Sequence, residues 1–180
     1  MIESARSAFA RRALRESLER RSPIGAEPDP RSRSVMIVLP DDEPGQRASW
    51  SFIRSIDLEA ARIQVVGLGS TGVGVPDAFA GHVRVIGESD LDWRRLPQRS
   101  VRDEVWASRP HVAINLSAPD SLAAAILVGA SPAQVRVGRY DLSRESCYDL
   151  MIQGEPTAER AADVLSRLLQ KVDPPILPLR

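Results

Sequence analysis

Cysteine is almost absent from this sequence: Cys147 is the one cysteine among 180 residues. A single thiol excludes an internal disulfide and a zinc site built from cysteine ligands. Long apolar runs are also missing, and no stretch of roughly 18 apolar residues predicts a membrane span. The first residues carry no uninterrupted apolar segment of the kind found in secretory signals, so we expect a cytoplasmic protein.

A net charge of one sign is missing as well, because 24 basic and 24 acidic residues cancel. This balance argues against a nucleic-acid-binding surface spread over the whole protein, although it allows a local basic patch. A chain of 180 residues is most simply one domain, long enough to bury about 70% of its unfolded surface. We therefore expect one domain with a substantial hydrophobic core.

One stretch in the second half of the chain decides the fold class, because it predicts a strand, a helix and a second strand in one run. Residues 112–116 are apolar and too few for a helix, which is typical of a strand buried on both faces. Residues 118–128 are rich in alanine, and Ser117 with Asp120 has the form of a capping box at the start of a helix. With a further strand at 134–137, this is a right-handed βαβ unit.

The rest of the chain continues the alternation of strands and helices. Short apolar runs predict further strands at 35–39, 63–68, 83–86 and 148–152. Helical patterns separate and follow them at 44–58, 100–108 and 156–172. We therefore predict an α/β domain of three layers, Rossmann-like, with a mostly parallel sheet and an N-terminal helical arm.

The arm and its connection have a different composition from the body. Residues 2–21 contain neither Gly nor Pro and are rich in Ala, Arg, Glu and Leu, which predicts a helix. The next residues contain three prolines and mixed charges, which predicts a linker. The expected organisation is a helical arm at 1–22, a linker at 23–34, the α/β domain at 35–173 and an extended tail at 174–180.

The helical arm is the first candidate for contact with another molecule. It carries two apolar stripes and six arginines, although i,i+4 pairs such as Arg12 with Glu16 partly neutralise the charge. The apolar stripes require packing, either on the arm's own domain or on a partner, and the arginines allow contact with RNA phosphates. The expected partner or RNA contacts are Phe9, Arg11, Leu14, Leu18, Arg20, Arg21 and, from a later loop, Trp93.

Other single residues are less informative. Trp93 lies in a connection between elements, where it either fixes the loop to the edge of the sheet or serves as an anchor in an interface. His82 and His111 have no neighbours at metal-ligand spacing, and Cys147 has no adjacent base. We expect structural positions for all three, so the sequence predicts no catalytic set and no metal site.

A glycine-rich loop has the spacing of a dinucleotide-binding fingerprint, through Gly67, Gly69 and Gly72. It follows a predicted strand, but Gly74 and Pro76 interrupt any helix that would begin after it. Because a pyrophosphate is held at the N-terminus of such a helix, we expect a surface loop rather than a nucleotide site.

A small-ligand site is a second possibility, at the carboxyl ends of two predicted strands. Asp41 and Asp42 follow the first strand, and Asn115 and Ser117 lie at the end of the strand at 112–116. Ligands bind at this edge in open α/β sheets, and clustered carboxylates there are suitable ligands for Mg²⁺. The alternative is that these side chains cap the helices that follow.

Two resemblances to known families rest on short sequence segments. The order of VAINL, a small-residue helix and VRVG is similar to the amino-terminal lobe of heptosyltransferase-type glycosyltransferases. Since those enzymes bind their nucleotide-sugar donor mainly in a second lobe, this resemblance implies the scaffold without the activity. Over nearly its whole length, the chain also resembles a small bacterial family known as a domain of unknown function. The resemblance rests on a basic first helix and on the segments VMIVLP, SDLDWRRL, VAINL, VRVG and YDLMI. The resemblance to that family implies no catalytic residues in this chain.

These observations predict a non-enzymatic binding or assembly module that docks on a larger protein partner through its first helix. One alternative is a small-ligand-binding or enzymatic site at the carboxyl edge of the sheet. Another is a ribosome-associated or RNA-associated protein that uses the arginines of the arm. No cofactor is expected in the leading interpretation.

Overall fold

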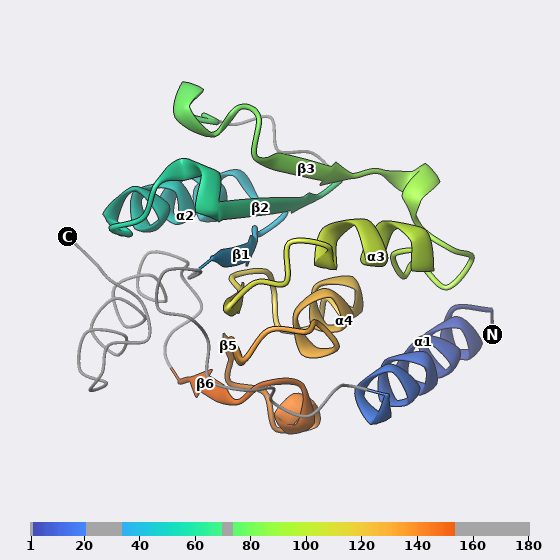
Figure 1. Ribbon diagram of the computed structural model, residues 1–180. Coiled ribbons are helices and arrows are strands. Elements are labelled where there is room, and N and C mark those ends of the chain that lie inside the picture. Colours follow the sequence, from blue (N-terminus) through green and yellow to red (C-terminus); the bar gives the residue numbers. More distant parts are fainter. Residues whose placement is uncertain (1, 21–33, 70–73, 154–180) are drawn as a thin grey trace.

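A parallel β-sheet of six strands forms the centre of the described chain, which in the computed structural model comprises residues 2–20, 34–69 and 74–153 (Figure 1). The strands are β1 (Val35–Val38), β2 (Ile63–Leu68), β3 (Val83–Ile86), β4 (Val112–Asn115), β5 (Val135–Arg139) and β6 (Leu150–Ile152). Their order is β3-β2-β1-β4-β5-β6, and every neighbouring pair is parallel. The predicted α/β class with a parallel sheet is thus confirmed.

The central strands are β1 and β4. Val35 of β1 is aligned with Ile63 of β2 on one side and with Val112 of β4 on the other. All residues of β1 and of β4 are buried. Because side chains alternate between the two faces, a strand covered on both faces has to be apolar nearly throughout. This explains the uninterrupted apolar runs in the sequence.

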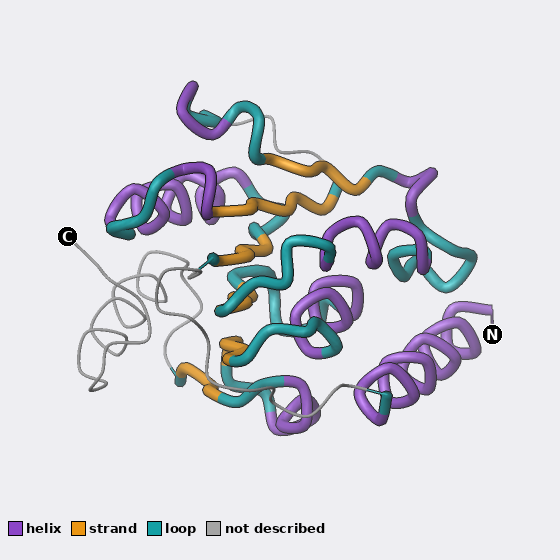
Figure 2. Tube along the Cα trace, in the orientation of Figure 1, coloured by secondary structure: helices purple, strands orange, loops and turns teal. Residues whose placement is uncertain are grey.

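Helices cover both faces of the sheet and produce the predicted layers (Figure 2). The α-helices are α1 (Ile2–Glu19), α2 (Glu43–Ser55), α3 (Arg99–Trp106) and α4 (Leu122–Gly129). Short 3-10 helices connect them: η2 (Ala60–Arg62), η3 (Asp77–Phe79), η4 (Glu88–Asp90) and η5 (Leu142–Cys147). Helix α2 lies on one face, α3 and α4 lie on the other, and α1 packs against α4.

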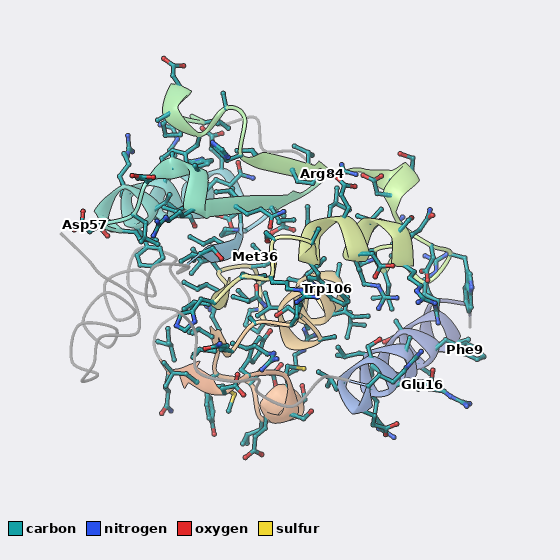
Figure 3. All side chains as sticks on the ribbon, in the orientation of Figure 1. Phe9, Glu16, Met36, Asp57, Arg84 and Trp106 are labelled. Atoms are coloured by element: carbon teal, nitrogen blue, oxygen red, sulfur yellow. The ribbon has the colours of Figure 1, made fainter. Side chains whose placement is uncertain are left out.

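Two hydrophobic clusters, one on each face, follow from the alternation of side chains along β1. Ile37 packs in the cluster that contains Trp50 of α2. Its neighbour Met36 points to the opposite face, into the cluster that contains Leu127 of α4 (Figure 3). All of these residues are almost fully buried. Each large apolar side chain removed from water in this way contributes about 1.5–3 kcal/mol.

Helix α1 packs on the domain through one of its faces. Ala10, Ala13 and Leu14 are buried in the same cluster as the residues of α4. Gly129 at the end of α4 allows this close approach, because an added Cβ would lie 3.2 Å from Leu18 Cδ2 and 3.1 Å from Cys147 Cβ. Of the two possibilities for the apolar stripes of the arm, the structure therefore shows packing on its own domain.

Helix α4 begins later than the sequence predicts. Ser121 is its N-cap, and the Ser121 hydroxyl accepts a backbone hydrogen bond from the first turn at 3.2 Å. Ser117 instead lies in a turn, where its N–H donates to Asn115 Oδ1 at 2.9 Å. Pro119 explains the difference, since a proline disfavours the helical conformation in the residue before it. The predicted capping box of Ser117 and Asp120 is therefore wrong.

Several predicted segments lie outside the described residues. These are most of the linker at 23–34, the helix at 156–172 and the tail at 174–180. Within the described ranges, no helix combines the length and the apolar character needed to cross a membrane.

Candidate functional site

The carboxyl edge of the sheet contains a topological switch point, because the strand order reverses between β1 and β4. Ligands of open α/β sheets bind at such a switch point. The register aligns Val38 at the end of β1 with Asn115 at the end of β4. The sheet therefore brings the residues that follow both strands, predicted as a ligand site, to one edge.

Asp42 acts as a helix cap at this edge. Its Oδ1 accepts a hydrogen bond from Gly45 N at 2.7 Å. An added Cβ at Gly45 would lie 2.8–2.9 Å from Asp42 and Pro40, and Gln46 Nε2 donates to Pro40 O at 3.1 Å. The turn between β1 and α2 is thus closed around a carboxylate, at the position where a dinucleotide-binding domain holds pyrophosphate. The capping alternative is confirmed for Asp42, while Asp41 is exposed.

Asn115 and Ser117 are also engaged within the protein. Asn115 Nδ2 donates to Tyr148 Oη at 2.7 Å, and Asn115 Oδ1 accepts from Ser117 N at 2.9 Å. Both residues are buried. Burial raises the pKa of Tyr148 to about 12, so its phenol is neutral at physiological pH. These hydrogen bonds connect β4 to the segment before β6 and leave the asparagine amide occupied.

The glycine-rich loop does not continue into a helix of useful length. Gly67 lies within β2, and Gly69 has a left-handed φ of 85° while its N–H donates to Ile86 O at 2.9 Å. Gly72 lies outside the described residues. The next described helix is the short η3, whose N-cap Pro76 makes no side-chain cap. The geometry required for a pyrophosphate at a helix N-terminus is therefore missing from the described part of this segment.

The two histidines lie at the amino ends of the strands, away from the carboxyl edge. His82 lines a hollow of about 290 Å³ at the amino ends of the strands, together with Ser34 and Ile63. His111 precedes β4, and its N–H donates to Ser34 O at 2.8 Å. Cys147 is buried. Among the described residues, no group of three or more His, Cys, Asp or Glu side chains is placed to hold a metal ion.

A more distinctive feature is the exposed aromatic pair of Phe9 on α1 and Trp93 in the loop before α3. The two rings meet edge to face, with centroids 5.5 Å apart and an interplanar angle of 64°. Phe9 is 51% exposed and Trp93 is 63% exposed. Trp93 therefore does not fix its loop to the edge of the sheet, which was one of the two predictions, but contacts the helical arm instead.

The loop that carries Trp93 is held in a defined shape by Asp92. Its carboxylate accepts hydrogen bonds from Arg94 N at 2.8 Å, Leu96 N at 3.1 Å and Arg94 Nη2 at 2.7 Å. Burial alone would raise the pKa of Asp92, but these bonds outweigh it and hold the pKa below its usual value. Arg95 adopts a left-handed φ of 61°, which is uncommon outside glycine. Trp93 is thus presented by a preorganised turn.

The other predicted contact residues of the arm lie on different faces of α1. Arg11 and Arg20 are exposed, Leu18 is half-buried, Leu14 is buried in the core, and Arg21 lies outside the described residues. A groove of about 380 Å³ runs beside this part of α1, lined by Arg11, Leu14, Arg15, Leu18, Leu122, Ser143, Arg144, Ser146 and Cys147. Leu14 is therefore mainly a core residue, although it also lines this groove.

Sequence reasoning missed the arginines that surround the aromatic pair. The Arg94 guanidinium lies 5.9 Å from the centre of the Trp93 ring, in a cation–π contact. Arg6 and Arg95 line a hollow of about 240 Å³ beside Trp93. The WRR order at 93–95 was a signal in the sequence, since two arginines next to an exposed tryptophan are typical of contact surfaces.

Comparison with known proteins places the chain in a family. No curated protein matches the sequence. A family model matches residues 6–170, which include most of the arm, the complete sheet and the Trp93 loop. The chain therefore belongs to DUF6913, a family of unknown function.

Proposed function

We propose that this protein is a non-enzymatic docking module that binds a protein partner through the aromatic pair of Phe9 and Trp93. The main support for this proposal is the pair itself. Its two large apolar side chains are each more than half exposed, and they contact each other although they belong to distant segments of the chain. Tryptophan and arginine are the residues most enriched among those that dominate binding energy in interfaces. The arginines at positions 6, 94 and 95 complete such a composition around the pair.

The rigidity of the surface supports the same proposal. Asp92 fixes the Trp93 turn through four hydrogen bonds, and α1 is fixed by its buried face. A preorganised surface loses little conformational entropy on binding, so more of the contact energy appears as affinity. The surroundings of the pair contain arginines as well as the carboxylates of Glu88 and Asp92, so we expect a partner that places an apolar side chain beside the pair and polar groups of both signs around it.

The carboxyl edge of the sheet supports a ligand-binding or enzymatic role less well. Asp42 is committed to the cap of α2, and Asn115 to Tyr148 and Ser117. A ligand there would have to displace these internal hydrogen bonds, and for the buried Asn115 an unmade hydrogen bond costs about 1–3 kcal/mol.

The test is affinity purification of the full chain from its native cells, with Trp93→Ala and Phe9→Ala as variants. Leu142→Ala is the matched control, because Leu142 is another large apolar side chain and is 70% exposed. We expect both aromatic variants to lower the affinity for the purified partner by about tenfold or more, and the control to leave it unchanged.

Two outcomes would contradict the proposal. Equal recovery by the wild type and both aromatic variants would show that the pair makes no contact. Recovery that disappears after RNase treatment and weakens steeply with salt would favour RNA association through the arginines. The proposal also keeps the expected cytoplasmic location, which cell fractionation tests.

A further inference from the structure

A second groove lies on the flank of α1 that faces α3, and it has an excess of positive charge. We propose that this groove binds a phosphate or pyrophosphate group. Its volume is about 230 Å³. The lining residues are Ser17, Arg20, Arg99, Arg102, Asp103, Trp106 and Ala130. This site is separate from the aromatic pair and does not depend on the proposed docking function.

Arg102 is the central residue of the groove. Its Nη1 donates to Ser17 Oγ at 3.2 Å, and its guanidinium lies 5.7 Å from the centre of the Trp106 ring. Its Nε is buried and has no hydrogen-bond acceptor in the described structure. No carboxylate of the described ranges forms an ion pair with it. A half-buried cation without an anionic partner is costly, and an incoming anion would remove that cost.

Other arginines that are buried or half-buried in this fold show how such a charge is normally balanced. Arg84 pairs with Asp90 at 3.2 Å and with Glu104 at 3.0 Å. Arg136, which is almost fully buried, pairs with Asp149 at 3.1 Å. The contrast with these residues indicates that, within the described ranges, Arg102 lacks the ion-paired carboxylate that Arg84 and Arg136 have.

The arginines beside Arg102 do have carboxylate partners, which balance their charge in part. Arg99 pairs with Asp103 at a distance of 3.7 Å, and Arg20 approaches Glu16 at 3.9 Å. Burial lowers the pKa of Arg102 and the positive charges of Arg20 and Arg94 lower it further, while the carboxylates of Asp103 and Asp92 raise it. The lining of the groove itself contains three arginines and one carboxylate, that of Asp103, and this excess of positive charge favours an anion.

The size and geometry of the groove select the class of anion. At about 30 Å³ of liquid volume per water, it holds roughly seven or eight waters, which suits a phosphate or pyrophosphate group. It is smaller than the roughly 300 Å³ at which pockets for whole small-molecule ligands begin. Planar guanidinium groups recognise phosphate oxygens through paired donors, and more than one arginine matches an anion of more than one charge.

The experiment is titration calorimetry of the full chain at constant ionic strength, with inorganic phosphate, pyrophosphate and ADP as separate probes. We expect saturable binding of pyrophosphate, weakened about tenfold or more by Arg102→Gln. The control is Arg54→Gln, because Arg54 is an exposed arginine of α2 on the opposite face of the sheet. Tighter binding of ADP than of pyrophosphate would identify the source as a phosphate carried by a nucleotide; tighter pyrophosphate binding would identify the free anion.

A second variant keeps the test decisive if Arg102→Gln does not fold. Arg20→Gln changes an exposed side chain, so it should retain the native circular dichroism spectrum while lowering pyrophosphate affinity about threefold or more. The absence of saturable binding by the wild type would overturn the proposal. Equal affinities of the wild type, Arg102→Gln and Arg20→Gln would overturn it as well.

Discussion

Replacement of Gly138 by alanine should destabilise the domain, although a strand normally favours alanine over glycine. Gly138 is buried in β5, and its backbone lies outside the left-handed region, so alanine meets no conformational penalty. By itself the change should stabilise the strand by about 0.5–1 kcal/mol. An added Cβ would, however, lie 2.5 Å from Tyr148 Cζ and 2.6 Å from Cε1 and Cε2. The tyrosine ring therefore lies directly over the glycine.

The magnitude follows from the anchoring of that ring. Carbon atoms pack at about 3.5–4.0 Å, so the Tyr148 ring would have to retreat by roughly 1 Å. Its hydroxyl accepts a hydrogen bond from Asn115 Nδ2 at 2.7 Å, and a shift of this size would break that bond. A buried donor without an acceptor costs about 1–3 kcal/mol, and overpacking costs about 1–3 kcal/mol more. After the gain in strand propensity is subtracted, we expect a net loss of about 1–5 kcal/mol.

The assay is equilibrium unfolding in guanidinium chloride. It compares the wild type, Gly138→Ala, Tyr148→Ala and the variant that carries both substitutions, as a double-mutant cycle. Tyr148→Ala lowers stability by itself, because it removes a buried ring. In that background Gly138→Ala should have no cost or should stabilise the protein, since nothing opposes the new methyl group. The reasoning would be refuted if Gly138→Ala had the same free energy of unfolding as the wild type. It would also be refuted if Gly138→Ala lowered the free energy of unfolding in the Tyr148→Ala background.

Three further measurements test other parts of the structure. Leu14→Ala removes a buried side chain and should lower the free energy of unfolding by about 2–5 kcal/mol. Arg12→Ala removes an exposed side chain of the same helix and should lower it by about 0.5 kcal/mol or less. Equal effects would show that α1 does not belong to the core. In the same assay, Asp42→Ala should cost about 1 kcal/mol through loss of the α2 cap, and Asp41→Ala should cost almost nothing. Because folding raises the pKa of Tyr148 to about 12, the unfolded chain releases this proton first as the pH rises above about 10. Stability should therefore fall between about pH 10 and pH 12, and Tyr148→Phe should remove that slope.

The strands were predictable because their signal is local. The apolar runs at 63–68 and 83–86 coincide with β2 and β3. In a parallel sheet covered on both faces, nearly every strand residue meets a protein environment, so composition alone marks the element. The cap of α2 by Asp42 was predictable for a related reason, since the contact spans only three residues.

The start of α4 shows where local reasoning selected the wrong one of two signals. Ser117 and Ser121 both precede an alanine-rich segment, and Asp120 made the first of them resemble a capping box. The structure uses Ser121, because Pro119 disfavours a helix at the preceding residue and Asn115 Oδ1 captures the Ser117 amide. The conflict between the proline and the capping box was already visible in the sequence.

The candidate surfaces depend on contacts that the sequence does not contain locally. Phe9 and Trp93 were each predicted as contact residues, but only the packing of α1 brings their rings to 5.5 Å. Arg102 is one of many arginines in the sequence, and its lack of a carboxylate becomes visible only where α3 meets α1. Tertiary packing decides which arginines have a partner, and composition cannot.

The strand order β3-β2-β1-β4-β5-β6 is the order found in dinucleotide-binding domains, yet the observations on this chain lead away from the switch point. That mode of binding requires an open helix N-terminus after the first strand, whose free N–H groups meet the pyrophosphate. Here the Asp42 carboxylate already accepts from that N-terminus, and Gly45 lets the turn close around it. A second anion at the same place would meet a fixed negative charge and one donor fewer. The groove between α1 and α3 has three arginines and one aspartate in its lining, so we expect an anion there rather than at the switch point, and strand order alone does not assign the function.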